Sequence, residues 1–187
     1  MSGIKVTPST IIDGVLHFDL VVNGDSRGWF KENYQAAKLE ALGLPAYFVP
    51  VQNNISYNAE AGVTRGIHAE PWDKYISIGL GEVFAALVDL RAGSPSYGMV
   101  QTYRLGVEDA IYVPRGVANS FQALQPNTLY TYMVNAHWSP EARYTMVNLG
   151  DPTLAIRWPI PLSEATVSDK DLAHPMLDDV TPMEVEK

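Results

Sequence analysis

The strongest constraint on the fold of this sequence is a succession of short apolar runs, each followed within a few residues by Gly, Pro, Asn or Asp. Runs of roughly four to eight residues with turn residues between them are typical of strands in a sandwich or barrel, whereas amphipathic helices need longer stretches. The pattern predicts an all-β domain, a jelly roll. The expected strands lie within residues 15–22, 75–90 (two strands separated at 79–81), 100–105, 110–113, 120–124 and 129–134.

Turn and helix signals complete this outline. Asn23-Gly24-Asp25 predicts a turn at the end of the first run. Gly43 and Pro45 predict the end of a helix over residues 34–42. A second short helix is expected over 168–173, with Ser168 as its cap and Asp171 at its third position. We therefore expect residues 1–187 to form a single β domain with minor helices near both ends.

Composition excludes several classes of protein. A net charge of −8 and a pI near 4.9 argue against a general nucleic-acid or anionic-membrane binder. The chain has no cysteine, which excludes disulfides, thiolate catalysis and cysteine-ligated metal centres. No run approaches the ~18 apolar residues of a membrane span, and no export signal is visible. We expect a cytoplasmic protein.

The histidines give little support to a metal centre. There are four of them, no two form an H-x-H pair, and the segment after His68 offers one carboxylate and no second imidazole. A catalytic metal in a β-barrel usually needs two or three histidines and a carboxylate at one point. The sequence therefore predicts no bound metal.

His68 is instead a candidate acid–base group, because Arg65 and Lys74 flank it in the sequence. Nearby cations favour the neutral imidazole, which accepts a proton, and they stabilise negative charge on a neighbouring oxygen. In a regular strand Arg65 and His68 would face opposite sides, unless Gly66 marks a bulge. On local sequence alone, an exposed strand with ordinary surface charges is the favoured interpretation.

Four other residues are candidates of the same kind. Tyr132 could donate a proton from inside a barrel, or it could simply pack there. Arg27 could hold a phosphate through both guanidinium nitrogens, and Glu32 and Gln52 could hydrogen-bond the edge of a pyrimidine base. Taken singly, Arg27, Glu32 and Gln52 are each more often ordinary surface residues, and for Tyr132 the local sequence does not decide.

Eight motifs in order along nearly the whole chain resemble the dTDP-4-dehydrorhamnose 3,5-epimerase family, in the branch with an H-A-E-P-W-D-K motif. They are D-S-R-G-W-F-K-E-N-Y (25–34), Q-N-N-I-S (52–56), R-G-I-H-A-E-P-W-D-K-Y (65–75), V-D-L-R-A-G-S (88–94), V-P-R-G-V-A-N-S-F-Q (113–122), Y-T-Y-M-V-N-A-H-W (130–138), D-P-T-L-A-I-R-W-P (151–159) and V-S-D-K-D-L-A-H-P (167–175).

The resemblance implies a cupin-type jelly roll (double-stranded β-helix), without metal or other cofactor, that forms a homodimer by exchanging strands. It implies epimerisation of dTDP-4-dehydro-6-deoxy-D-glucose at C3 and C5, through an enolate, to dTDP-4-dehydro-L-rhamnose. The matching catalytic positions are His68 as base, Asp171 as its orienting carboxylate, Lys74 beside the enolate oxygen and Tyr132 as general acid. The matching substrate-binding positions are Arg27, Glu32, Gln52, Asn54, Arg65, Asn119 and Trp138.

Two departures concern the substrate. Ser120 stands where the family usually has glycine, and His137 where an aromatic residue is expected. Two alternatives therefore stay open. One is an epimerase that inverts only C3 or C5 of another dTDP-4-keto-deoxysugar, and the other is a cupin that binds a nucleotide sugar without turnover.

Overall fold

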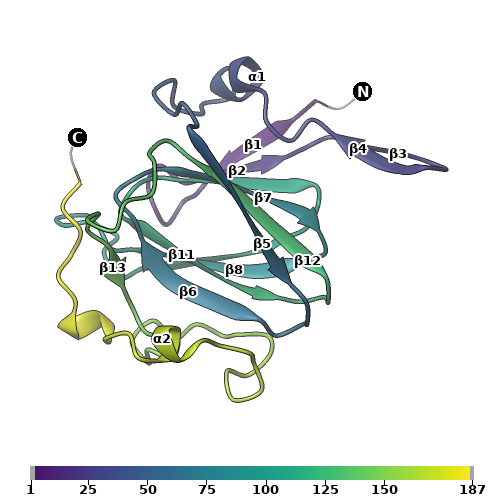
Figure 1. Cartoon of the computed structure of the whole chain (residues 1–187). Coiled ribbons are helices and arrows are strands. Elements are labelled where there is room, and N and C mark those ends of the chain that lie inside the picture. The colour runs from purple at the N-terminus through teal and green to yellow at the C-terminus, as the bar shows by residue number, and fades with distance from the viewer. Residues whose placement is uncertain (1–2, 186–187) are drawn as a thin grey trace.

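The computed structural model describes residues 3–185, and in it two antiparallel sheets face each other as the layers of a jelly roll (Figure 1). Short alternating strands with one buried face form such layers because each sheet must cover its apolar side. The first sheet has six strands, in the spatial order β1 (Lys5–Pro8), β2 (Leu16–Asp19), β10 (Asp109–Val113), β7 (Lys74–Leu80), β12 (Thr128–Val134) and β5 (Gln52–Asn58).

The second sheet lies below the first in Figure 1 and carries five strands. Every neighbouring pair in it is antiparallel. In spatial order these strands are β13 (Thr145–Met146), β6 (Thr64–Ala69), β11 (Val117–Ala123), β8 (Val83–Asp89) and β9 (Val100–Leu105).

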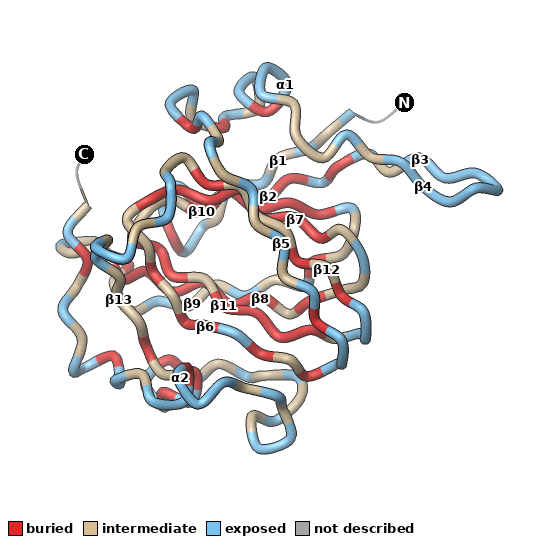
Figure 2. Tube along the Cα trace, viewed as in Figure 1, coloured by how far each residue is buried: buried red, intermediate tan, exposed pale blue. Residues whose placement is uncertain are grey.

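The main core lies between the two sheets, where Figure 2 shows buried residues on facing strands. Ile76 and Ile78 of β7 face Val83 and Leu87 of β8, and all four are at most 2% exposed. Close packing of this kind holds the strands at fixed positions, so side chains at the open end of the barrel are carried on a rigid frame.

Two further clusters pack outside this core. Leu39 of α1 (Ala36–Glu40) is buried with Phe48 against Tyr75 and Tyr112 on the outer face of the six-stranded sheet. Residues of the C-terminal segment, which includes the 3₁₀ helix η1 (Leu177–Asp179), cover the outer face of the other sheet. The C-terminal segment brings α2 (Asp169–Leu172) beside β6.

The helix predictions are confirmed in position and differ in length. Helix α1 covers five of the nine predicted residues, because Gln35 caps its start by accepting a hydrogen bond from Lys38 N. Ser168 caps α2 by accepting a hydrogen bond from the backbone N–H of Asp171, the third helical residue, as predicted.

The predicted turn at residues 23–25 is wrong. These residues belong to β3 (Val22–Asp25), which pairs with β4 (Gly28–Lys31), and the turn lies at residues 26–27. The carboxylate of Asp25 accepts a hydrogen bond of 2.9 Å from the backbone N–H of Arg27, which fixes the turn two residues later than the Asn-Gly signal suggests. The resulting hairpin projects from the body of the molecule (Figure 1).

Among residues 3–185, no helix is long and apolar enough to cross a membrane.

Candidate active site

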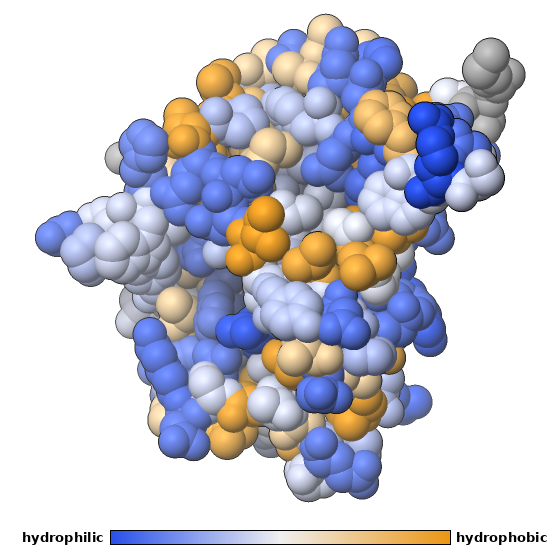
Figure 3. Space-filling view, turned by 45° about the vertical axis from the view of Figure 1, so that its right-hand side comes forward, coloured by the Kyte–Doolittle hydropathy of each residue, from blue (hydrophilic) through white to orange (hydrophobic). Residues whose placement is uncertain are grey.

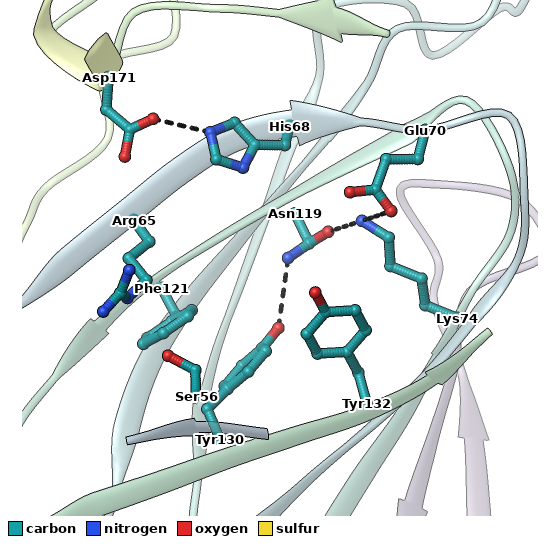
Figure 4. Close-up of a pocket in the computed structure, with 10 residues that line it drawn as sticks. All are labelled: Ser56, Arg65, His68, Glu70, Lys74, Asn119, Phe121, Tyr130, Tyr132 and Asp171. Atoms are coloured by element: carbon teal, nitrogen blue, oxygen red, sulfur yellow. Dashed lines mark hydrogen bonds and ion pairs between the residues drawn. The ribbon is translucent and has the colours of Figure 1, made fainter. Parts of the chain in front are cut away.

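A pocket of about 260 Å³ opens between the two sheets at one end of the barrel. Its walls come from β5, β6, β7, β11 and β12, and α2 contributes one carboxylate (Figure 4). The lining residues are Ser56, Arg65, His68, Glu70, Lys74, Asn119, Phe121, Tyr130, Tyr132 and Asp171. All four predicted catalytic residues are among them.

A bulge in β6 brings Arg65 and His68 into this one pocket. His68 pairs with Asn119 while Arg65 pairs with Phe121, so three steps along β6 match two along β11. Regular alternation would have placed Arg65 and His68 on opposite faces. The structure instead contains a bulge at Gly66, which is the alternative that the sequence analysis allowed.

Gly66 is required at the bulge for two reasons. Its φ of +131° is a conformation that L side chains rarely adopt, and a Cβ there would lie 2.3 Å from Cβ of Ser120. Ser120 itself is fully buried beneath the bulge and donates a hydrogen bond of 2.8 Å to the carbonyl of Ala86. It therefore supports the strand that carries His68, and it does not line the pocket.

His68 and Asp171 form a hydrogen-bonded pair although they are 103 residues apart. Nε2 of the imidazole lies 2.8 Å from Oδ1 of Asp171, and the other ring nitrogen, Nδ1, points into the pocket (Figure 4). Burial by itself raises the pKa of Asp171, but the hydrogen bond and the attraction from His68 outweigh it and hold that pKa below its usual range. An ionised carboxylate accepts only, so we assign the proton to Nε2, which leaves the lone pair on Nδ1.

Lys74 lies deep in the same pocket and is only 3% exposed. Its ammonium group forms an ion pair of 3.0 Å with Glu70 and a hydrogen bond with the side-chain oxygen of Asn119. Burial lowers the pKa of Lys74, and Glu70 opposes this effect. A buried cation held by these two partners can stabilise an oxyanion that develops beside it.

Two tyrosines form the wall opposite His68 (Figure 4). Burial raises the pKa of Tyr132, and the charge of Glu70 raises it further, so its hydroxyl stays protonated at neutral pH. Tyr130 stacks on Phe121 with ring centroids 4.0 Å apart, and its hydroxyl accepts a hydrogen bond from Asn119. Tyr132 is thus the tyrosine whose hydroxyl is free to approach a ligand.

Two of the predicted substrate-binding residues, Gln52 and Asn54, extend this pocket along β5. Gln52, Asn54 and Ser56 alternate on one face of the strand, and Ser56 lines the pocket. Gln52 donates a hydrogen bond of 2.9 Å to Asn54 and accepts one of 2.9 Å from the backbone of Trp138. Polar groups therefore continue from the pocket toward the side of the barrel where Trp138 is exposed.

Arg27 and Glu32 do not reach the pocket of their own chain. Arg27 lies at the tip of the hairpin, paired with Asp25, and its side chain is 88% exposed. Glu32 forms an exposed ion pair with Lys38. The structure therefore separates these two predicted substrate-binding residues from the other predicted site residues.

Sequence reasoning missed several groups in or beside the pocket. Glu70 and Tyr130 could have been found, because Glu70 lies between His68 and Lys74 and Tyr130 shares a strand face with Tyr132. His174 had no such signal: it stacks edge-on against His68, with ring centroids 5.5 Å apart, from 106 positions later in the chain. A second imidazole is thus present beside His68, although its own segment offers none.

Comparison with known proteins identifies the family. The model of the dTDP-4-dehydrorhamnose 3,5-epimerase family matches residues 9–179. The chain belongs to this epimerase family. It is similar to the RmlC homolog of Streptococcus pyogenes, with 46% identity over 92% of this chain and 89% of that protein. It is also similar to the dTDP-4-dehydrorhamnose 3,5-epimerase of Pseudomonas aeruginosa, with 39% identity over 89% and 92% of the two chains.

A solved structure extends the agreement to the fold of the epimerase family. The structure of RmlC from Streptococcus suis in complex with dTDP-D-xylose superposes with a TM-score of 0.92 and 44% identity, covering 98% of this chain and 96% of that one. The predictions of the epimerase family and of an all-β, cupin-type jelly roll are confirmed.

Proposed function

We propose that this protein is a cytoplasmic enzyme that epimerises dTDP-4-dehydro-6-deoxy-D-glucose at C3 and C5 to dTDP-4-dehydro-L-rhamnose. One observation carries the proposal: the His68–Asp171 pair and the Tyr132 hydroxyl face each other across a pocket, with the Lys74 ammonium group at one side of it (Figure 4). We further propose that residues 1–187 form one epimerase domain, of which the structure describes 3–185.

The reaction begins at a carbon next to the 4-ketone, which acidifies its hydrogen. Nδ1 of His68 removes that proton, and Asp171 stabilises the imidazolium that forms. The electron pair moves onto O4, where Lys74 stabilises the enolate with help from Arg65. Both cations line the same pocket as the base, which supports these roles.

Inversion requires that the new proton arrive on the other face of the sugar ring. Tyr132 gives its hydroxyl proton to the carbon from the side opposite His68, and the enolate returns to the ketone. His68 then releases its captured proton to solvent and Tyr132 regains a proton from solvent, so that the same base and acid can act at the second carbon. The residues that extend the pocket along β5, together with Asn119 and Trp138, hold the rest of the dTDP-sugar.

The proposal is tested by running the reaction in heavy water with a chelator present. The expected product, trapped by a 4-keto reductase, is L-configured and carries solvent deuterium at both C3 and C5, as measured by NMR and mass spectrometry. Deuterium at one carbon would show a single-carbon epimerase. Binding of the substrate without exchange would show a nucleotide-sugar-binding protein and overturn the catalytic assignment.

We also propose that the protein is a homodimer in which the β3–β4 hairpin crosses to the partner. Trp29 and Phe30 of the hairpin are 44% and 70% exposed. Ile55 and Tyr57 are 68% and 57% exposed on β5, an edge strand of the six-stranded sheet. Exposed apolar side chains on a projecting hairpin and on a sheet edge mark interaction surfaces. Hydrophobic residues also gather near the centre of the molecular face shown in Figure 3.

Strand exchange would account for the isolation of Arg27 and Glu32. A hairpin that reaches the partner carries both residues toward the partner's pocket, where Arg27 can hold the diphosphate. Two-fold symmetry then gives two composite sites, each with His68 from one chain and Arg27 from the other.

We expect co-expressed His68→Gln and Arg27→Ala chains to recover activity that neither variant has alone. Each mixed dimer has one intact composite site out of two, so purified mixed dimers should reach about half of the wild-type activity per dimer. Tagged mixed dimers are purified and assayed against each parent variant. If Arg27 serves the pocket of its own chain, the mixed dimer has no intact site and no recovery occurs.

A further inference from the structure

His174 is buried in a way that protein contacts do not explain. Its side chain is 9% exposed, and neither ring nitrogen has a hydrogen-bond partner among residues 3–185. The backbone of Val147 comes near the ring without reaching hydrogen-bonding geometry. A buried polar group without a hydrogen-bond partner destabilises the folded protein, so the two ring nitrogens point to a ligand that the protein atoms do not supply.

The ring of His174 is directed at the His68–Asp171 pair. Nδ1 of His174 lies 3.9 Å from Oδ1 of Asp171, which already accepts the hydrogen bond from His68. One potential ligand atom from each of the three residues lies within 4.8 Å of the other two. Two imidazoles and a carboxylate are a ligand set that Zn²⁺ accepts, with a fourth position left open.

We propose that His68, Asp171 and His174 form a binding site for one transition-metal ion such as Zn²⁺, and that the bound ion inhibits the enzyme. Zn–N and Zn–O bonds of about 2.0–2.2 Å place tetrahedral ligands roughly 3.3 Å apart. His68 Nε2 and Asp171 Oδ1, now 2.8 Å apart, need to separate by about 0.5 Å, and His174 Nδ1 needs to approach Asp171 Oδ1 by about 0.6 Å. The ligand atoms of the two histidines already lie within 4.8 Å of each other.

Inhibition follows from the position of one proton on His68. In the metal-free pair, Nε2 carries the proton and the lone pair of Nδ1 faces the pocket. A metal ion takes the lone pair of Nε2, and the proton that Nε2 carried moves to Nδ1. The imidazole stays neutral, but its pocket-facing nitrogen is now a donor and can no longer accept a proton from the sugar.

Nearby positive charge limits the affinity of the site. Arg65 lines the same pocket, and the charge of Lys170 acts on His174. These cations oppose a divalent ion, whereas Asp171 provides the only negative charge among the three ligands. The site therefore suits reversible inhibition and not a permanently bound cofactor.

Another cluster, His17, Asp19 and Asp109, offers a matched control. Its ligand atoms are also within 4.8 Å of one another, but His17 Nε2 already pairs with Asp109 at 2.7 Å, and the other oxygen of Asp109 accepts from Gly106 N. This cluster therefore has partners for its buried polar groups, unlike His174.

The binding test uses Co²⁺ and Zn²⁺ on chelator-treated protein, with Co²⁺ absorption and calorimetry as readouts. We expect one ion per chain, and an affinity for Zn²⁺ that falls in His174→Phe by more than the ~10–100-fold that loss of an outer-shell partner costs. His17→Gln should bind as the wild type does. If the phenylalanine variant does not fold, His174→Gln gives the same comparison. Equal binding by wild type and His174 variants, or no binding by the wild type, overturns the site.

The inhibitory consequence rests on the proposed function, whereas metal binding does not. Zn²⁺ should lower turnover of the wild type, reversibly on addition of chelator, and should inhibit the His174 variant much less. Cobalt absorption without any epimerase activity would support the site and count against the function. Metal binding at His174 with turnover unchanged by Zn²⁺ would overturn the proposed inhibition.

Discussion

Replacing His68 by glutamine is expected to lower solvent exchange at C3 and C5 by at least about 10³-fold, within the range that removal of a general base costs. Nδ1 of His68 is the basic atom that the structure directs into the pocket, and Asp171 holds the ring in the tautomer that keeps this nitrogen unprotonated. A glutamine amide can still hydrogen-bond Asp171 but cannot take a proton from carbon. Deuterium incorporation into the substrate, followed by mass spectrometry, measures the effect directly.

The matched control is the same substitution at His17. His17 on β2 pairs with Asp109 on β10, and neither strand contributes a residue to the pocket, so His17→Gln should exchange hydrogen within about twofold of the wild type. Thermal unfolding of both variants separates a catalytic loss from a folding loss. Exchange by His68→Gln at more than a tenth of the wild-type rate would show that another group is the base.

Several strands were predictable because apolar runs and turn residues mark them directly. The expected strand 15–22 is instead divided between β2 and β3, and β1, β4, β5, β6 and β13 lie outside all the expected ranges. The expected strand 100–105 matches β9, and 110–113 and 129–134 each fall one residue short of β10 and β12. The side chains of these strands fill the space between two sheets, so their hydrophobic pattern follows the fold closely. The turn at Asn23-Gly24 was wrong because the side chain of Asp25 stabilises a later turn, which is a local contact that composition does not reveal.

The site was less predictable from the residues themselves. Alternation along β6 separates Arg65 from His68, and only the bulge at Gly66, which depends on close contact with Ser120, joins them. Pairing of His68 with Asp171 depends on the C-terminal segment returning to β6, and no local pattern encodes that return. The resemblance to the epimerase family predicted the pairing of His68 with Asp171. Neither the local sequence pattern nor that resemblance indicated His174.

The β3–β4 hairpin shows a different limit on prediction, because the contacts within one chain do not define the role of its residues. Arg27 has the chemistry to hold a diphosphate, yet its own chain leaves it 88% exposed and paired with Asp25. A residue that acts on a partner's substrate cannot be placed by the contacts of a single protomer. The separation of Arg27 from the pocket is thus itself an argument for an assembly.

Tyr132→Phe is expected to separate proton abstraction from inversion. Its hydroxyl is the proton donor on the face opposite His68, so its loss should lower the yield of inverted product by about 10²–10⁴-fold. Abstraction by His68 does not require that hydroxyl. Because the His68 side chain is 30% exposed, its captured proton can exchange with solvent and return to the same face of the carbon.

Tyr132→Phe should therefore incorporate deuterium with retained configuration, at a rate within about tenfold of the wild type. NMR of the recovered substrate reports exchange, and reductase trapping reports inverted product. Tyr97→Phe is the control, because Tyr97 lies outside the pocket and packs against the hydrophobic cluster on the outer face of the five-stranded sheet. This variant should leave both rates unchanged.

Tyr130 is the competing proton donor. Its hydroxyl already accepts a hydrogen bond from Asn119, and burial raises the pKa of Tyr130 far above the usual range. If Tyr132→Phe still inverts while Tyr130→Phe does not, the acid is Tyr130, and the sugar lies two residues further along β12, toward the buried Tyr130.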